Sequence, residues 1–185
     1  MDDDITQHLL QWVRSHYFGK FRGTVTDNQD MTNRGRLKVS VPAVLGSLEV
    51  WAMPCVPYAG DGVGFYSLPP NQSGVWVEFE AGDPSYPIWT GCFWADDELP
   101  DTGGPSIKFW KTDSLTVRMD DDGDELKVAT GSNSTITLSD DVEIASGGAT
   151  HSVGSDGVSS SSGGVGKVEV AGDSVSINSG AFEVS

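Results

Sequence analysis

The sequence predicts an all-β protein with a short N-terminal helix, a small barrel of short strands and a C-terminal series of very short strands. The two halves of the 185-residue chain differ in chemistry, because 16 of the 17 aromatic residues and all nine prolines lie at or before Trp110. After Trp110, apolar residues recur as pairs two positions apart, separated by Gly, Asp, Asn and Ser. That spacing is the alternation of a strand.

Residues 1–18 are expected to form the helical N-terminus. Within DITQHLLQWVRSHY (4–17), helical spacing makes one apolar face of Ile5, Leu9, Trp12 or Val13, and His16. The acidic start suits the positive end of the helix dipole, and Gly19 ends the helix. Neither His8 nor His16 has a Cys or His partner at ligand spacing, so we expect surface or packing roles for both.

Residues 19–99 are expected to form one barrel domain. Runs rich in Val, Phe and Trp are separated by turn residues and predict five or six strands, at 21–27, 35–42, 50–58, 62–69, 74–80 and 86–94. A five-stranded OB-type barrel fits this count, and an SH3-like barrel fits nearly as well. Trp51, Trp76, Trp89 and Trp94 are interpreted as core or interface residues. Two cysteines, Cys55 and Cys92, permit one disulfide, but two partly buried free thiols are favoured.

Residues 100–112 are expected to be a neck, and residues 113–185 a repetitive region of short strands. Ile107/Phe109 make the first apolar pair, and each later pair is one face of a strand too short to be stable alone. Three chains wound together would bury the pairs in a shared core, as a trimeric β-helix. The predicted core consists of Leu115, Val117, Leu126, Val128, Ile136, Leu138, Val142, Ile144, Val168, Val170, Val175 and Ile177. The Gly/Ser-rich stretch 146–165 is expected to be looser or in turns, and a disordered tail is the alternative.

Composition and motifs argue against several classes of function. The net charge of −16 opposes binding of nucleic acid or of anionic lipid. There is no apolar run of about 18 residues and no basic leader that would indicate a signal peptide. No Gly-x-Ser-x-Gly elbow occurs, and the acidic run 120–125 lacks the EF-hand spacing, so it is interpreted as a solvated turn. We therefore expect no enzyme activity, cofactor or metal site.

One segment carries a more specific sequence signal than the strand pattern does. GVWVEFEAGDPSYPIWTG (74–91) resembles the signature of the OB domain in spike proteins of contractile injection systems. These are the phage baseplate assembly protein V family and the related spike region of the type VI secretion protein VgrG. Residues 17–25 and 33–39 are similar to the opening of that domain, with Met31 where the family commonly has Pro. Gly82, Asp83 and Pro84 form the signature turn, in which Asp83 can accept bonds from backbone amides.

The resemblance implies a homotrimeric central spike in the tail baseplate of a virion or phage-like particle, assembled in the host cytoplasm. Its partners would be a baseplate hub protein, a separate PAAR-type tip cap where one is present, and the target cell envelope that it pierces. Many members end in His-x-His, which binds metal at the tip, but no His follows His151 here. The tip would then be plugged by Phe182 and Val184 or covered by the separate PAAR-type cap. The lysozyme domain of some phage spikes is absent, so no wall hydrolysis is expected.

Two other functions compete with the spike. One is a receptor- or glycan-binding OB-type module on a trimeric β stalk, as in tail fibres. Exposed Trp or Tyr residues beside a saccharide-sized groove would favour that module. The other is a hydrolase, which would need a nucleophile and base brought together by the fold, and no pattern in the sequence specifies such a pair.

Overall fold

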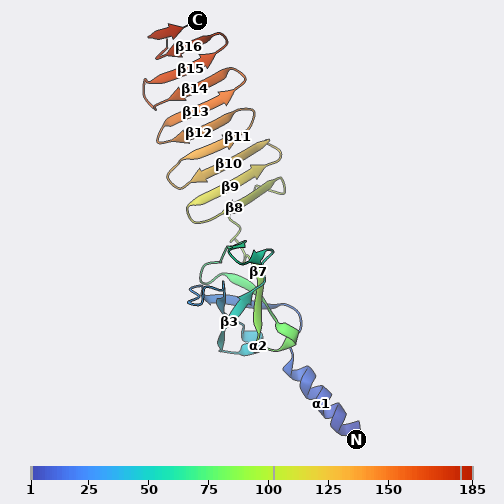
Figure 1. Cartoon of the computed structure of the whole chain (residues 1–185). Coiled ribbons are helices and arrows are strands. Elements are labelled where there is room, and N and C mark those ends of the chain that lie inside the picture. Colours follow the sequence, from blue (N-terminus) through green and yellow to red (C-terminus); the bar gives the residue numbers. More distant parts are fainter. Residues whose placement is uncertain (1, 102, 180, 185) are drawn as a thin grey trace. The chain divides into compact units, whose positions relative to one another are not determined.

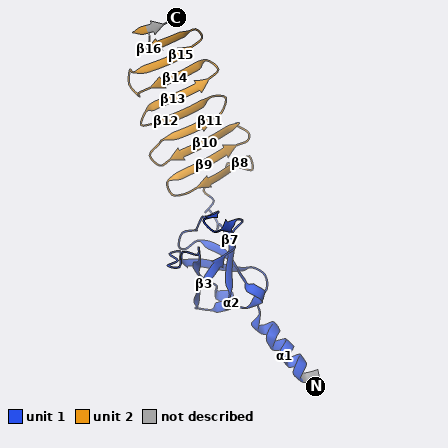
Figure 2. Cartoon of the chain, in the orientation of Figure 1, with its two compact units in different colours: residues 1–99 blue, residues 100–185 orange. Residues whose placement is uncertain are grey.

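The computed structural model describes residues 2–101, 103–179 and 181–184. The chain divides into two compact units, residues 1–99 and 100–185 (Figures 1 and 2). The first unit holds the helices and a closed barrel, and the second is one sheet. Strand β8 (Ile107–Lys111) lies in the segment 100–112, which is predicted to be a neck.

The N-terminal unit is a closed barrel of five strands in the order β1-β2-β3-β7-β6. The strands are β1 (Phe21–Asp27), β2 (Leu37–Ser40), β3 (Glu49–Pro54), β6 (Gly74–Phe79) and β7 (Pro87–Phe93). β3 and β7 pair in parallel, and the other neighbours pair antiparallel. A meander of three strands, closed by a later hairpin that pairs with both of its edges, is the OB arrangement.

Alternation along these strands builds the barrel core. In β6 every second residue is buried, starting at Val75, while the residues between are half-exposed. Among the described residues, all of the buried apolar side chains of the core lie in this unit. They are Val25, Leu37, Val39, Val41, Ala52, Val75, Val77, Phe79 and Trp89. Four tryptophans were predicted to be core or interface residues, and of these Trp89 is buried, at 5% exposed. Trp94 is 63% exposed, and Trp51 and Trp76 are intermediate.

The segment 62–69 is not a barrel strand, contrary to expectation. Only Val63–Gly64 (β5) is extended, and it pairs with Ala59–Gly60 (β4) in a small separate hairpin. The glycines at 60, 62 and 64 favour a tight turn, and the two prolines at 69 and 70 cannot donate to a sheet. The remaining short elements are the single-turn helix α2 (Pro42–Leu45) and the 3-10 turn η1 (Glu80–Gly82).

Helix α1 (Asp2–Ser15) confirms the predicted N-terminal helix. Its apolar side chains stay exposed, with Ile5 at 63% and Leu9 at 62%. His16 stacks on Trp12 with ring centroids 4.3 Å apart, so it packs at the helix end. His8 accompanies Asp4 one turn away on the helix surface. Cys55 and Cys92 are free thiols, and both residues are exposed, although the thiol group of Cys92 is partly shielded from solvent. Partial burial is therefore corrected for Cys55 alone.

The C-terminal unit is one sheet of ten strands in chain order, each antiparallel to the next. After β8 the strands are β9 (Leu115–Asp120), β10 (Glu125–Thr130), β11 (Thr135–Leu138), β12 (Val142–Ser146), β13 (Ala149–Gly154), β14 (Gly157–Ser161), β15 (Lys167–Ala171), β16 (Ser174–Ile177) and β17 (Phe182–Val184). β13 and β14 occupy most of the stretch 146–165, so the expectation of looser structure or turns there was wrong. Their backbones join the same ladder as their neighbours, although serine replaces most apolar residues.

Candidate functional site

The signature turn lies between β6 and β7 and holds the end of helix α1. The backbone N–H of Ser85 donates to Asp83 Oδ1 at 2.9 Å, and this bond is the main cause of the lowered pKa of Asp83. The N–H of Tyr17 donates to the carbonyl of Gly82 at 2.8 Å. Gly82 has φ of +82°, and an added Cβ would lie 2.8 Å from the ring of Phe18. The turn therefore requires a glycine at 82, both for its backbone and for this contact.

A second anchored loop joins β1 to β2 around the carboxylate of Asp30. Its oxygens accept bonds from the backbone amides of Thr32, Arg34 and Arg36 and from the Arg36 guanidinium, at 2.8 Å to Nη2. The Asp30 side chain is only 3% exposed. The Arg36 guanidinium is the main cause that holds the pKa of Asp30 far below its usual range. The loop is thus built on a carboxylate that stays ionised, and Arg36 also lies over Trp51, 5.2 Å from the ring centroid.

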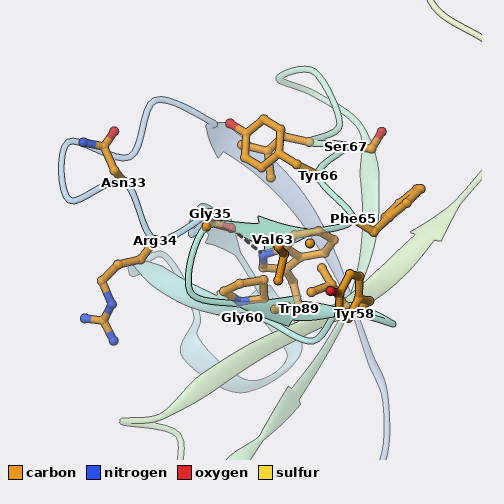
Figure 3. A pocket seen from close by; sticks show the side chains of 16 residues that line it. Asn33, Arg34, Gly35, Tyr58, Gly60, Val63, Phe65, Tyr66, Ser67 and Trp89 are labelled. Carbon is orange, nitrogen blue, oxygen red and sulfur yellow. Dashed lines mark hydrogen bonds between the residues drawn. The ribbon is translucent and has the colours of Figure 1, made fainter.

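Beside this loop is a pocket of about 360 Å³. Its lining includes Asn33–Gly35, the hairpin β4–β5 and the segment up to Leu68. In Figure 3, Tyr58, Phe65 and Tyr66 stand around Trp89, while the side chain of Arg34 extends away from it. Trp89 Nε1 donates to the carbonyl of Gly35 at 3.2 Å, as the dashed line marks. The pocket is therefore mainly aromatic and apolar.

One of the two faces of the C-terminal sheet is apolar, and we refer to it below as the apolar face. Residues that pair directly across strands share a face, so the register defines two columns along it. The first column consists of Trp110, Val117, Val128, Ile136, Ile144, His151, Ser160, Val168, Ile177 and Phe182. The second consists of Lys108, Met119, Leu126, Leu138, Val142, Val153, Val158, Val170 and Val175.

This apolar face is exposed. Ile144 is 47% exposed, Val170 43% and Phe182 60%. No described side chain of residues 100–185 falls in the buried class. The other face is polar, with Lys127, Glu143 and Glu169 at paired positions along it. The Arg118 guanidinium there contacts Asp101 and Asp120, each at 3.2 Å.

Comparison with known families identifies the barrel. Residues 21–94 match the family model Phage_base_V, described as the type VI secretion system/phage-baseplate injector OB domain. Residues 21–94 are thus similar to the injector OB domain. The match spans the five barrel strands and includes the signature turn and the Asp30 loop. A search of curated proteins found none that matches the chain.

This match supports a phage-baseplate-related structural role for the chain. Such a role implies association with a tail or secretion apparatus and with other baseplate components. The match also decides between the two barrels that the strand count left open, in favour of the OB barrel. In the described part of the chain, no helix is long and apolar enough to span a membrane.

The structure places the residues singled out from the sequence in two locations. Gly82, Asp83 and Pro84 lie in the turn of the injector OB domain, next to the end of α1. Eleven of the twelve predicted core residues fall in the two columns, and Leu115 shares their face because it pairs with Thr130. At the tip, Phe182 ends the first column, and Val184 pairs with Val175 through its backbone. The side chain of Val184 lies outside the described residues.

Two features were missed or misplaced. Ile107 and Phe109 do form one side of a strand, but they pair with Asp120 and Arg118 and so lie on the polar face. Trp110, 58% exposed, takes the apolar position instead. Register determines this, and a strand's own sequence does not reveal its register. The Asp30 loop was also missed, although the sequence itself places an acid six residues before an arginine within a turn.

Proposed function

We propose that the chain is the structural central spike of a contractile injection system, a homotrimer whose C-terminal units form a needle. One observation carries this proposal. The C-terminal unit has no buried side chain among its described residues, although one face of its sheet is apolar from β9 to β17. A single sheet needs a second layer to cover such a face. Further copies of the same chain supply that layer, with their apolar faces turned to a common axis.

Energetics favour this assembly. From β9 to β17, eleven side chains of the apolar face are between 38% and 60% exposed. Full burial of an aliphatic side chain contributes about 1.5–3 kcal/mol, so covering the exposed two fifths contributes roughly 0.6–1.2 kcal/mol each, or roughly 7–13 kcal/mol per chain. Association of two proteins costs about 4–15 kcal/mol in lost freedom. Three chains together would gain roughly 20–40 kcal/mol, against about 8–30 kcal/mol for the two association steps, so the apolar face favours self-association of the chain.

Three copies are favoured over two by the narrowness of the face. Because the face has two columns, each strand contributes about two apolar side chains. That narrow strip suits a thin core around an axis better than the broad interface of a two-sheet sandwich. Strands of 4–6 residues are about 13–20 Å long, and ten of them stack to about 43 Å at their usual spacing. The match of residues 21–94 to the injector OB domain also supports a trimeric spike. The polar faces would then lie outside, where a net charge of −16 per chain opposes aggregation.

The proposed role is mechanical and non-catalytic. The spike would dock under a baseplate hub protein, carry a separate PAAR-type cap if one is present, and enter the target cell envelope when the sheath contracts. A ladder in which every strand is hydrogen-bonded to its neighbours resists bending, and burial around the axis would add to that stiffness. No cofactor is needed for this work.

The test is the mass of the full chain in solution by light scattering at pH 8, followed by an SDS gel without boiling. Three chains of 19.6 kDa give 3 × 19.6 = 58.8 kDa, and two give 2 × 19.6 = 39.2 kDa. A mass of 58.8 kDa that survives SDS supports the wound needle. A particle of 19.6 or 39.2 kDa at micromolar concentration overturns the trimer.

A second candidate function has one observation in its favour. Tyr58 and Tyr66, 59% and 75% exposed, border the aromatic pocket, as a saccharide-binding module requires. A glycan array probed with the full chain tests this reading. Binding that Tyr66→Ala abolishes and Tyr86→Ala retains would support it, because Tyr86 is 60% exposed and lies in the signature turn instead of the pocket. An array without any bound glycan would reject it.

A further inference from the structure

The apolar face is interrupted at one place. In the first column, His151 on β13 and Ser160 on β14 stand between Ile144 and Val168. The second column continues through the same two strands with Val153 and Val158. The interruption is therefore confined to one position per strand and does not reflect a polar hairpin as a whole.

The two polar side chains are partners of each other. His151 Nδ1 lies 2.7 Å from Ser160 Oγ, across the pair of strands. Whichever atom donates, the bond satisfies one nitrogen of the imidazole. This bond does not use the second nitrogen of the imidazole, Nε2. The His151 side chain lies at an exposed position of the apolar face. Any layer that covers the face must meet this imidazole.

The surroundings of His151 on that face carry no charge. On β12 the side chains of the same face are Val142, Ile144 and Ser146, and on β14 they are Val158 and Ser160. Glu143 on β12 and Glu169 on β15 belong to the polar face by alternation. Asp141 and Asp156 lie in the turns beyond Val153, at the other end of β13. Within strands β9–β16 as described, His151 is the one titratable side chain on the apolar face.

We infer that His151 and Ser160 form a polar layer inside the proposed trimer, and that the needle holds together only while the three imidazoles are neutral. The inference rests on the proposed function, because the second and third copies of the chain are what bury the layer. Three neutral imidazole–hydroxyl pairs can share hydrogen bonds around an axis. Three protonated imidazoles would place like charges together in a site lined by valine and isoleucine, with no carboxylate to pair them.

The sign of the effect follows from linkage. Histidine in an unfolded chain titrates near pH 6.5, and exclusion of the proton from the assembled layer makes the separated chains bind more protons than the trimer. Trimer stability is then fully present above about pH 6.5 and is lost as the pH falls below it. Between about pH 6.5 and 5.5 each excluded proton changes the equilibrium at most about 5-fold, because the free imidazole is already half protonated at pH 6.5, so three together raise the trimer dissociation constant up to roughly 170-fold.

The overall charge of the chain acts in the opposite direction. At pH 7 each chain carries −16, so copies repel one another. Protonation of histidines or carboxylates lowers that repulsion and favours assembly as the pH falls. A loss of trimer on mild acidification therefore cannot come from general electrostatics, which makes the direction of the effect diagnostic.

The experiment follows the mass and melting temperature of the full chain from pH 8 to pH 5, in buffer with a chelator. Native protein, His151→Val, Ser160→Val and His8→Gln are compared, the last as a matched control because His8 lies on the exposed face of helix α1. The native trimer and His8→Gln should lose stability together as the pH falls. His151→Val completes the apolar column and should melt higher than native at pH 5.5 and show none of this decline. Ser160→Val leaves the imidazole without its hydroxyl partner and should be less stable at pH 8.

The outcomes separate this inference from the function on which it rests. A chain that is monomeric at pH 8 overturns the trimer and the polar layer with it. If the native protein and His151→Val are both trimers and their melting temperatures change alike from pH 8 to pH 5, only the polar layer is overturned. A trimer in which His8→Gln, and not His151→Val, removes the pH dependence also overturns it.

Discussion

Replacing Ile144 by alanine should dissociate the proposed trimeric needle without unfolding the barrel. Ile144 lies in the first column on β12 and is 47% exposed in a single chain. Truncation of a fully buried isoleucine to alanine costs about 2–5 kcal/mol. Scaled by the part that only assembly would bury, the cost is about 1–2.4 kcal/mol per chain, or about 3–7 kcal/mol per trimer. The dissociation constant should rise roughly 10²- to 10⁵-fold.

Sedimentation equilibrium over a concentration series measures this change, and the neighbouring residue provides its control. Glu143 precedes Ile144 and belongs to the polar face, where it pairs with Thr137 and Ser152. Glu143→Ala should therefore associate like the native chain. The reasoning would be refuted if Ile144→Ala sedimented as the native trimer, or if Glu143→Ala were the variant that dissociated.

The other predictions concern the N-terminal unit. Asp30→Asn should lower the melting temperature of the barrel at pH 7. Because the folded pKa of Asp30 lies below the unfolded value, its contribution is present above about pH 4 and lost at lower pH, so thermal scans of native and variant should converge in acid. Gly82→Ala should destabilise the unit by about 1–3 kcal/mol in urea titrations, since φ is positive and the new methyl group meets the ring of Phe18. Burial raises the pKa of the Cys92 thiol, so at pH 8 iodoacetamide should label Cys92 more slowly than Cys55 in a peptide-resolved time course, and equal rates would contradict this.

The barrel was predictable because its strands carry their own signal. In β6, valine at 75 and 77 alternates with half-exposed residues, and that period appears in the sequence whatever the neighbouring strands do. The segment 62–69 imitates the same alternation with Val63 and Phe65, but glycines and the Pro69–Pro70 pair keep it out of the barrel. Composition alone does not distinguish β6 from the segment 62–69. Closure of the barrel depends on which strand edges are free to pair, and composition does not reveal this.

In the C-terminal sheet, prediction from the sequence is limited by strand pairing, which local composition does not reveal. β13 and β14 bury little of their own and hold serine where other strands hold valine, so their composition indicates turns. They are strands because β12 and β15 on either side present edges to pair with, which is a property of the ladder. The same dependence on register put Phe109 on the polar face and brought His151 opposite Ser160.

The meander of the C-terminal sheet pairs each strand only with those next to it in the chain. Its contacts are local, so the sheet can form by successive addition of strands, without a long loop to close. The same connectivity makes length adjustable. Removing or adding one hairpin, two strands with their turns, would restore the direction of the chain and change the stack by about 10 Å at the usual strand spacing. Such a fold allows the reach of the protein to evolve by whole hairpins while its cross-section stays the same.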